Sequence, residues 1–320
     1  MRALVIKEES LVFEDRPTPQ VGAYDVLVRV EAAGLNAADL MQRRGFYPAP
    51  PGWPEDIPGM ELAGVVVGVG DRVIEPLMGR RVCALVGGGA QAEFCAVPAE
   101  HLLFVPDHVT FNEAGGFAEA FCTAHDALAT QGQLEAGERV LISGAAGGVG
   151  VAGVQIAHAL GAHVVAATRD DTFHARLRDL GADEAITLDQ VDAIAGVDVV
   201  LELIGAAHLA RALQVLNPYS RVVIIGVSGG SRIDLNLLQL MQRRVTLTGS
   251  TLRSRSREQK AEVTRRVAEA LIPRWRAREL NVPLAHVFPF DEAAPAYDYF
   301  AQPGKFGKVV LHVEREAEPS

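Results

Sequence analysis

A run of small residues between two apolar segments is the part of the sequence best suited to hold a charged ligand. Four glycines lie within residues 144–150, directly after the apolar segment 140–143. Such a turn between a strand and a helix directs backbone N–H groups and the positive helix end at a pyrophosphate. Glycine is needed because a Cβ would block the phosphate and the packing of helix on strand. The turn predicts a dinucleotide site, although Ala145 interrupts the G-x-G-x-x-G pattern, and a purely structural turn is the alternative.

The residues after the second strand of such a unit decide which dinucleotide is bound. The apolar segment 163–167 ends in Thr168 and Arg169, and Asp170 and Asp171 follow. The Arg169 guanidinium is suited to pair with a 2′-phosphate, which favours NADPH. The Asp170 carboxylate would instead bind the ribose hydroxyls of NADH, and a plain surface Arg–Asp turn is the third alternative.

These residues need a parallel sheet to position them, and the pattern after residue 118 predicts one. Apolar segments alternate with amphipathic ones, which is typical of a parallel sheet with helices on both faces. The predicted strands are 140–143, 164–167, 197–203 and 221–225, and the predicted helices are 149–160, 172–180 and 208–216. Residues 140–168 carry no charge, but six glycines in this stretch favour strand, turn, helix and strand over a membrane helix.

The first hundred residues show a different pattern, of short strands separated by turns. Strands are predicted at 26–32, 62–69, 81–86 and 92–97, and five prolines between residues 48 and 58 indicate an extended loop. This region is expected to be antiparallel or barrel-like. Later, residues 258–278 form a charged helical stretch, broken before Pro273, and the strand 308–313 follows.

Composition excludes several classes of function. The chain has 320 residues, enough for about two domains, and its net charge of −10 disfavours binding to nucleic acid or an anionic membrane. Eight arginines between residues 253 and 278 are interspersed with glutamates, which favours a solvated helix face over a nucleic-acid site. Three cysteines without a C-x-x-C pair, and histidines without H-E-x-x-H, predict no metal site. No signal-peptide pattern opens the chain, so we expect a soluble, cytoplasmic protein.

Several motifs in one order make the sequence resemble a known family. They are AAGLNAAD at 32–39, GFYP at 45–48, PGMELAG at 58–64, AAGGVG at 145–150 and GKVVL at 307–311. Together they resemble the zinc-free quinone oxidoreductase branch of the medium-chain dehydrogenase/reductase superfamily. GSTLRSR at 249–255 is similar to the subgroup of the tumour-suppressor-inducible quinone oxidoreductase.

This resemblance implies an α/β fold in which a Rossmann doubly wound parallel sheet is inserted into a GroES-like, partly closed β-barrel. The catalytic domain would comprise residues 1–118 and 259–320, and the dinucleotide-binding domain residues 119–258. The family forms dimers by joining two nucleotide-binding sheets, and residues 245–249 match its dimer-forming edge strand. Zinc-containing relatives carry a cysteine ligand just after the glycine that corresponds to Gly34, where this chain has Leu35 and Asn36.

The resemblance also implies roles for individual residues. Three would lie at the reacting centre: Asn36 and Asp39 near the nicotinamide, and Tyr47 over the substrate. Asp39 as a mere helix cap and Tyr47 as mere packing on the proline loop are the alternatives. The residues that would bind the cofactor are Thr123, Ala145, Ala146, Gly147, Gly148, Val149, Gly150, Arg169, Gly226, Val227 and Lys308.

The resulting prediction is a zinc-independent NADPH-dependent quinone oxidoreductase that moves a hydride from the nicotinamide to a quinone. Tyr47 or a water would stabilise the developing oxyanion. Reduction of the C=C bond of an enone or alkenal is the alternative within enzymes, because it uses the same hydride geometry. A cofactor-binding protein with little turnover is the alternative outside them.

Overall fold

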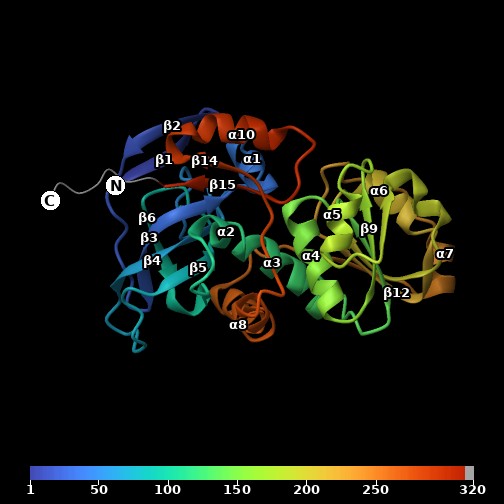
Figure 1. Cartoon of the computed structure of the whole chain (residues 1–320). Helices are drawn as coiled ribbons and strands as arrows, with labels where there is room; N and C mark the ends of the chain where they lie inside the picture. Colours follow the sequence, from blue (N-terminus) through green and yellow to red (C-terminus); the bar gives the residue numbers. More distant parts are fainter. Residues whose placement is uncertain (314–320) are drawn as a thin grey trace. The chain divides into compact units, whose positions relative to one another are not determined.

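The computed structural model describes residues 1–313. The chain forms two compact units (Figure 1). The first unit comprises Met1–Cys122 and the chain from Leu252 onward, and the second unit comprises Thr123–Thr251. The expected domain boundaries, after residues 118 and 258, lie four and seven residues from these bounds.

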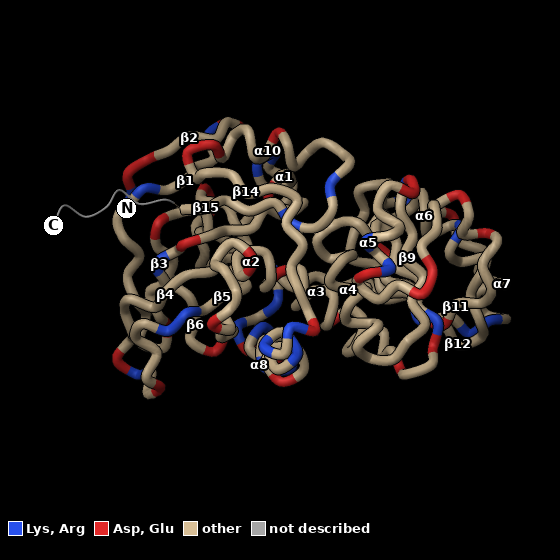
Figure 2. The backbone as a smooth tube through the Cα atoms, viewed as in Figure 1, with Lys and Arg blue, Asp and Glu red and all other residues tan. Residues whose placement is uncertain are grey.

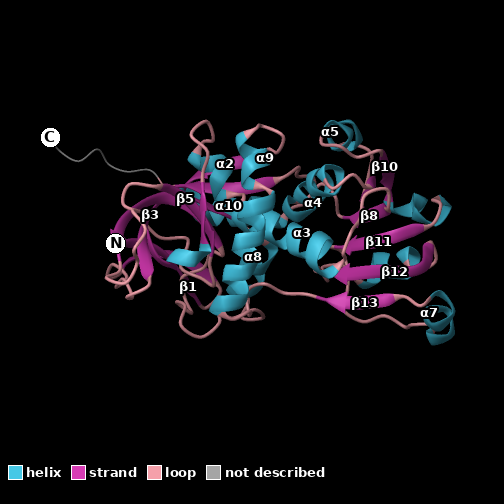
Figure 3. Ribbon diagram, turned by 90° about the horizontal axis from the view of Figure 1, so that it is seen from below, coloured by secondary structure: helices cyan, strands magenta, loops and turns pink. Residues whose placement is uncertain are grey.

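The second unit is built on a six-stranded sheet in which every strand pair is parallel. Its strands, in spatial order, are β10 (Glu184–Thr187), β9 (His163–Thr168), β8 (Arg139–Ser143), β11 (Val197–Glu202), β12 (Leu216–Ile224) and β13 (Thr246–Gly249). Its helices are η2 (Asp126–Gln131), α4 (Gly148–Ala159), α5 (His174–Asp179), η3 (Leu188–Ala193), α6 (Ala206–Ala212) and α7 (Leu237–Arg243). The strand order reverses between β8 and β11, as in a Rossmann fold, and this switch point is where such sheets bind ligands (Figure 3).

The uncharged stretch 140–168 folds as predicted, into a strand, a turn, a helix and a second strand. Val140, Leu141 and Ile142 are fully buried, as are Val164 and Val165. Strands covered by helices on both faces are apolar throughout, which explains the absence of alternation here. Helix α4 is 12 residues long, and no helix within residues 1–313 is long and apolar enough to span a bilayer.

One predicted helix is wrong at its carboxyl end. Residues 208–216 were expected to be helical up to the break at Asn217 and Pro218, but α6 ends at Ala212 and β12 already begins at Leu216. The register between β11 and β12 shifts after the pair Val197–Leu216 and becomes regular at Arg221. Pro218 therefore lies in the irregular part of the strand, where a missing N–H is tolerated.

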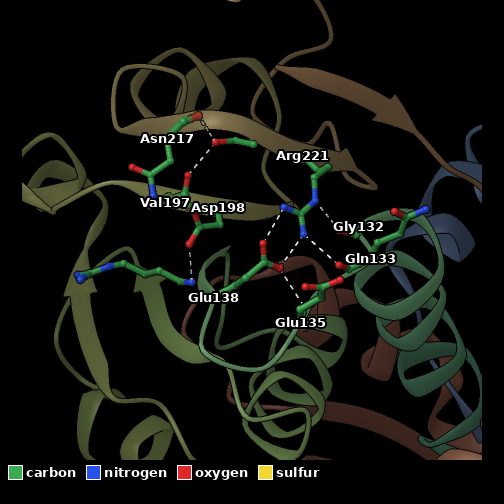
Figure 4. A network of polar contacts seen from close by, with 10 residues as sticks. Gly132, Gln133, Glu135, Glu138, Val197, Asp198, Asn217 and Arg221 are labelled. Carbon is green, nitrogen blue, oxygen red and sulfur yellow. Dashed lines mark hydrogen bonds and ion pairs between the residues drawn. The ribbon is translucent and has the colours of Figure 1, made fainter. Parts of the chain in front are cut away.

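The amino ends of the central strands are joined by a polar network (Figure 4). Arg221 of β12 makes two bonds to the Glu138 carboxylate, at 2.8 and 2.6 Å, and donates to the backbone carbonyls of Gly132 and Gln133. Asp198 of β11 accepts the Arg139 backbone N–H at 2.8 Å. Bidentate pairs of this kind fix geometry as well as adding energy. They hold the sheet together at the end opposite the glycine turn.

The first unit is built on a curved, mostly antiparallel sheet of seven strands. They are β3 (Asp25–Gly34), β4 (Glu61–Val69), β5 (Arg81–Leu85), β6 (Phe94–Pro98), β7 (Leu102–Phe104), β14 (Leu284–Pro289) and β15 (Lys308–His312), and β1 (Arg2–Lys7) and β2 (Ser10–Asp15) form a separate hairpin. The helices are α1 (Ala37–Arg43), η1 (Ala99–His101), α2 (Phe111–Gly115), α8 (Arg257–Ala270), α9 (Ile272–Arg276), η4 (Phe290–Glu292) and α10 (Ala293–Ala301), and α3 (Ala118–His125) crosses the unit boundary.

Buried and partly exposed residues alternate along β3, so one of its faces points into the core. Val26, Val28 and Val30 are fully buried, whereas the residues between them are partly exposed. β15, from the end of the chain, pairs antiparallel with the end of β3. Consequently Lys308, which opens β15, lies beside the segment that follows β3.

The predicted break before Pro273 is confirmed, since α8 ends at Ala270 and α9 has Pro273 in its first turn.

Candidate functional site

The glycine turn of the second unit has the geometry that a dinucleotide requires. Gly144 has φ of +61°, and Gly147 caps helix α4, so the first N–H groups of α4 lack helical partners. A Cβ at Gly150 would lie 2.5 Å from the Gly144 carbonyl oxygen. A Cβ at Gly153 would meet Leu201 of β11 at 2.8 Å. The backbone and the helix end are thus free to approach a pyrophosphate closely.

A buried polar cluster, which the sequence reasoning missed, holds the strand ends beside this turn. Glu202, at the end of β11, accepts hydrogen bonds from Ser143 Oγ at 2.7 Å and from His208 Nδ1 at 2.6 Å. Ser143 Oγ in turn accepts the Leu203 N–H at 2.7 Å. Burial opposes ionisation of Glu202, but these donors, His208 foremost, keep its pKa below the ordinary value. The cluster ties β8 to β11 at the switch point; the only sequence signal is one acidic residue ending an apolar strand.

The end of β9 forms the rim of a hollow of about 520 Å³. Arg169 and Asp170 both line it, and both are exposed. The Asp170 carboxylate accepts the Thr172 N–H at 3.1 Å, and hydrogen bonds from Thr172 hold its pKa below the ordinary value. Thr168 Oγ1 donates to the Asp170 carbonyl oxygen at 2.7 Å and fixes the bend. The arginine and the aspartate are therefore adjacent, and one Asp170 oxygen already accepts a hydrogen bond from its own loop.

Two more predicted cofactor residues follow β12, and a third opens the second unit. A Cβ on Gly226 would lie 2.2 Å from the Leu203 carbonyl oxygen, so only glycine fits there. Val227 is 46% exposed. Thr123, on α3, is buried.

In the first unit, Asn36 and Asp39 form the capped start of helix α1. The Asp39 carboxylate accepts the Asn36 N–H at 2.8 Å and the Gly59 N–H at 3.2 Å. Asp39 is fully buried, and burial raises its pKa from 3.8 to about 6, against these donors and the charges of Arg253 and Lys308. Asp39 therefore does take part in capping the helix, as the alternative interpretation expected. The cap residue itself is Asn36, and Asp39 is its partner in the first turn.

Lys308 and Asn36 meet in a second buried cluster, together with Glu61, which the sequence reasoning did not single out. Lys308 Nζ lies 2.6 Å from Glu61 Oε1, 2.6 Å from Asn36 Oδ1 and 2.9 Å from the Leu35 carbonyl oxygen. Asn36 Nδ2 donates to Glu61 at 3.0 Å, and the Glu119 N–H donates to the other Glu61 oxygen at 2.8 Å. The Asn36 amide is therefore fixed in orientation by a lysine and a carboxylate.

Tyr47 is half-buried and joined to the first unit through Arg253, another residue that was not singled out. The Arg253 guanidinium lies 5.1 Å from the centre of the Tyr47 ring and donates to the Tyr47 carbonyl oxygen at 2.8 Å. It also donates to Gln42 Oε1 at 2.7 Å, on helix α1. Burial raises the pKa of Tyr47, with Arg253 acting in the opposite direction. The phenol therefore keeps its proton at neutral pH and is available as a donor.

The structure divides the predicted site residues between the two units. Asn36, Asp39 and Lys308 come together around the start of α1, and Tyr47 is linked to them through Arg253. Within residues 1–313, no three His, Cys, Asp or Glu side chains are grouped so as to hold a metal ion.

Comparisons with known proteins agree with this architecture. The alcohol dehydrogenase GroES-like domain matches residues 22–133, and the zinc-binding dehydrogenase domain matches residues 148–269. The synaptic vesicle membrane protein VAT-1 homolog of Rattus norvegicus is 31% identical, with 95% of this chain and 81% of that protein covered. The quinone oxidoreductase of Lama guanicoe is 30% identical, with 97% of each covered.

A solved structure is similar over almost the whole chain. The quinone oxidoreductase of Thermus thermophilus superposes with a TM-score of 0.84 at 35% identity, covering 98% of this chain and all of that one. The fold and the glycine turn define a dinucleotide-binding dehydrogenase of two parts. The chain belongs to the medium-chain dehydrogenase/reductase superfamily, in the branch with the quinone oxidoreductases and the VAT-1 proteins, and is an oxidoreductase of that family.

Proposed function

We propose that this oxidoreductase is a zinc-independent enzyme that transfers a hydride from NADPH to a quinone. The observation that carries the proposal is the glycine turn at the switch point, whose contacts leave room only for glycine at residue 150. Relatives named quinone oxidoreductase, one of them described in complex with NADPH, support the choice of substrate and cofactor.

The second unit supplies the cofactor-binding residues in this proposal. Backbone N–H groups of residues 145–150 bind the pyrophosphate, and Arg169 pairs with the 2′-phosphate. One oxygen of the Asp170 carboxylate accepts the Thr172 N–H, which reduces but does not remove its capacity to bind a ribose hydroxyl. Thr123 binds the nicotinamide carboxamide, and Gly226 and Val227 back the ring. The bound nicotinamide supplies the hydride.

The first unit orients the substrate. Tyr47 donates a hydrogen bond to the quinone oxygen and stabilises the charge that develops there, since its phenol stays protonated. The Asn36 amide, held by Lys308 and Glu61, offers a fixed polar contact near the reacting atoms. The Lys308 ammonium is already bound by Asn36, Glu61 and the Leu35 carbonyl. Lys308 therefore contributes near the cofactor indirectly, by holding the Asn36 amide in place. Asp39 fixes the backbone of Asn36.

We also propose a homodimer formed through residues 245–249, in a cytoplasmic protein. β13 is an edge strand that pairs with β12, and helix α7 lies near it (Figure 3). Leu237 and Met241 of α7 are 66% and 72% exposed. An unpaired strand edge beside an apolar helix face is suited to pair with a second copy. Light scattering should give twice the 34.2 kDa mass of one chain.

The deciding experiment is oxidation of NADPH and NADH by the purified protein, with 1,4-naphthoquinone and a 2-alkenal as acceptors in separate assays. We expect quinone-dependent oxidation with a strong preference for NADPH. Turnover of the alkenal alone would assign a double-bond reductase instead. Cofactor binding without turnover of either acceptor would contradict an enzymatic role.

Two variants test the assigned residues. Arg169→Ala should raise the KM for NADPH about ten-fold and leave that for NADH unchanged, because one charge-assisted bond is lost. Arg178→Ala, an exposed arginine on α5, is the matched control. Tyr47→Phe should lower kcat several-fold; complete loss of turnover would indicate an obligatory proton donor rather than a hydrogen-bond donor.

A further inference from the structure

The first unit contains a hollow of about 640 Å³ that none of the proposed catalytic residues lines. Apolar side chains, among them Trp53, Ile57 and Phe94, cover much of its wall. Basic side chains of the segment 255–260 line it as well. Its volume falls in the range of small-molecule sites, which are mostly apolar with a few convergent polar groups. We call it the Lys260 hollow.

Lys260 is the unusual group in this wall. It lies on helix α8, and the residue is only 4% exposed. Within the described chain no hydrogen-bond acceptor or carboxylate contacts its ammonium, and the Trp53 ring lies 5.8 Å away. Burial lowers the pKa of Lys260, and Arg253 acts in the same direction. The ammonium reaches the hollow without a counter-ion from the described chain, so an anion bound there would complete it.

Other basic residues of α8 do have acidic partners, unlike Lys260. The helix carries both acidic and basic residues (Figure 2). Arg265 contacts Glu262 and Glu269 at 2.8 and 2.7 Å, and Arg266 contacts Glu262 at 2.6 Å. These pairs lie on the exposed face. Lys260, on the buried face, is the residue left without one.

The remaining charges around the hollow leave the Lys260 charge uncompensated. Asp25 lines the hollow, but its carboxylate pairs with Arg257 at 2.8 Å. Arg257 also pairs with Glu100. His101 Nε2 lies 2.9 Å from the Arg257 carbonyl oxygen and so carries the proton, while its Nδ1 is buried without a partner. The hollow thus offers a cation beside an indole ring.

We infer that the Lys260 hollow binds a small organic anion, with its carboxylate on the Lys260 ammonium and its flat apolar body against Trp53. A single unpartnered ammonium calls for a single negative charge, and the apolar wall calls for a ring or chain rather than a bare inorganic ion. This binding is separate from the hydride transfer proposed above, and it gives the protein a second ligand site.

Calorimetric titration of the full chain with 2-naphthoate tests the inference, and 2-naphthamide is the uncharged control ligand. We expect 2-naphthoate to bind at least about ten-fold more tightly than the amide, since the amide cannot pair with the ammonium. Lys260→Met should weaken binding of the acid at least about ten-fold and leave binding of the amide unchanged. Lys7→Met, an exposed lysine outside the hollow, should change neither.

Because 2-naphthoate is also similar in shape to a quinone, the titration is repeated with Tyr47→Phe. Unchanged affinity in that variant and loss in Lys260→Met place the acid in the hollow. Absence of binding to the folded wild type, equal binding of acid and amide, or an affinity that Lys260→Met leaves intact would each overturn the inference. Lys260→Arg, which keeps the charge, should restore most of the affinity and excludes a general loss of structure.

Discussion

Lys308 and Lys260 lie in the same unit and are buried to the same degree, 3% and 4% exposed, yet their surroundings are opposite. Lys308 has a carboxylate and two oxygen acceptors within 2.9 Å. Lys260 has an aromatic ring and no acceptor within the described residues. A buried charge with every partner in place holds a structure in one geometry, whereas a buried charge without partners is a place for a ligand. Lys308 therefore has a structural role, and Lys260 has the role in ligand binding inferred above.

The largest effect is expected for Lys308→Met. It leaves the Glu61 carboxylate buried without a counter-ion, which costs about 3–5 kcal/mol of unfolding free energy. Both tryptophans, Trp53 and Trp275, lie in the first unit, so their fluorescence during urea unfolding reports on that unit alone. A loss below about 1 kcal/mol would show that Lys308 is no better paired than a surface lysine.

Asp39 allows a similar test with an acidic group, because it is a buried carboxyl near both Lys308 and Arg253. Its pKa is raised to about 6, so the folded state retains a proton that the unfolded state releases above pH of about 4. Ionisation in the folded state therefore lowers the free energy of unfolding, by about 3 kcal/mol between pH of about 4 and 7.

Asp39→Asn removes this titration. Its unfolding free energy relative to wild type should rise with pH across that window, whatever constant offset the lost hydrogen bond adds. A difference that stays flat with pH would contradict the raised pKa.

The coupling between Lys308 and Glu61 should be smaller, about 2 kcal/mol. In the double variant Lys308→Met with Glu61→Gln, no uncompensated charge is left, so its loss of stability should be below the sum of the two single losses. The four proteins of the cycle are compared by the same urea unfolding. Additive losses would show that the two charges do not act as a pair.

The smallest effect, and the one of opposite sign, is expected for Lys260→Met. Removing an ammonium that has no partner should leave the unfolding free energy unchanged or raise it by up to about 1 kcal/mol. Lys7→Met, at a surface ion pair, provides the baseline. A loss of more than about 1 kcal/mol would mean that Lys260 has a stabilising role that its contacts do not explain, and the contrast with Lys308 would fail.

The sequence predicts best where one local pattern decides the structure. The parallel sheet and the glycine turn follow from uncharged segments and from glycines at one strand end, so both were predictable. Glu61, Glu202 and Arg253 were not, because each acquires its importance from a partner brought in by tertiary folding. Glu61 meets Lys308 across most of the chain's length, and Arg253 donates to Gln42, 211 residues away. A charged residue in an apolar segment signals that a partner exists, but not which one.

The pairing of β15 with β3 also determines when the protein can mature during synthesis. The second unit is one continuous segment, so it can fold while the ribosome is still adding the rest of the chain. The first unit folds later, since Asn36 and Lys308 are 272 residues apart and the whole second unit is synthesised before Lys308. Until then residues 32–34 at the end of β3 lack the β15 strand, and Glu61 and Asn36 are left without the lysine that orients them. A chain that stops before β15 would therefore retain the glycine turn and lack the cluster that Lys308 forms with Glu61 and Asn36.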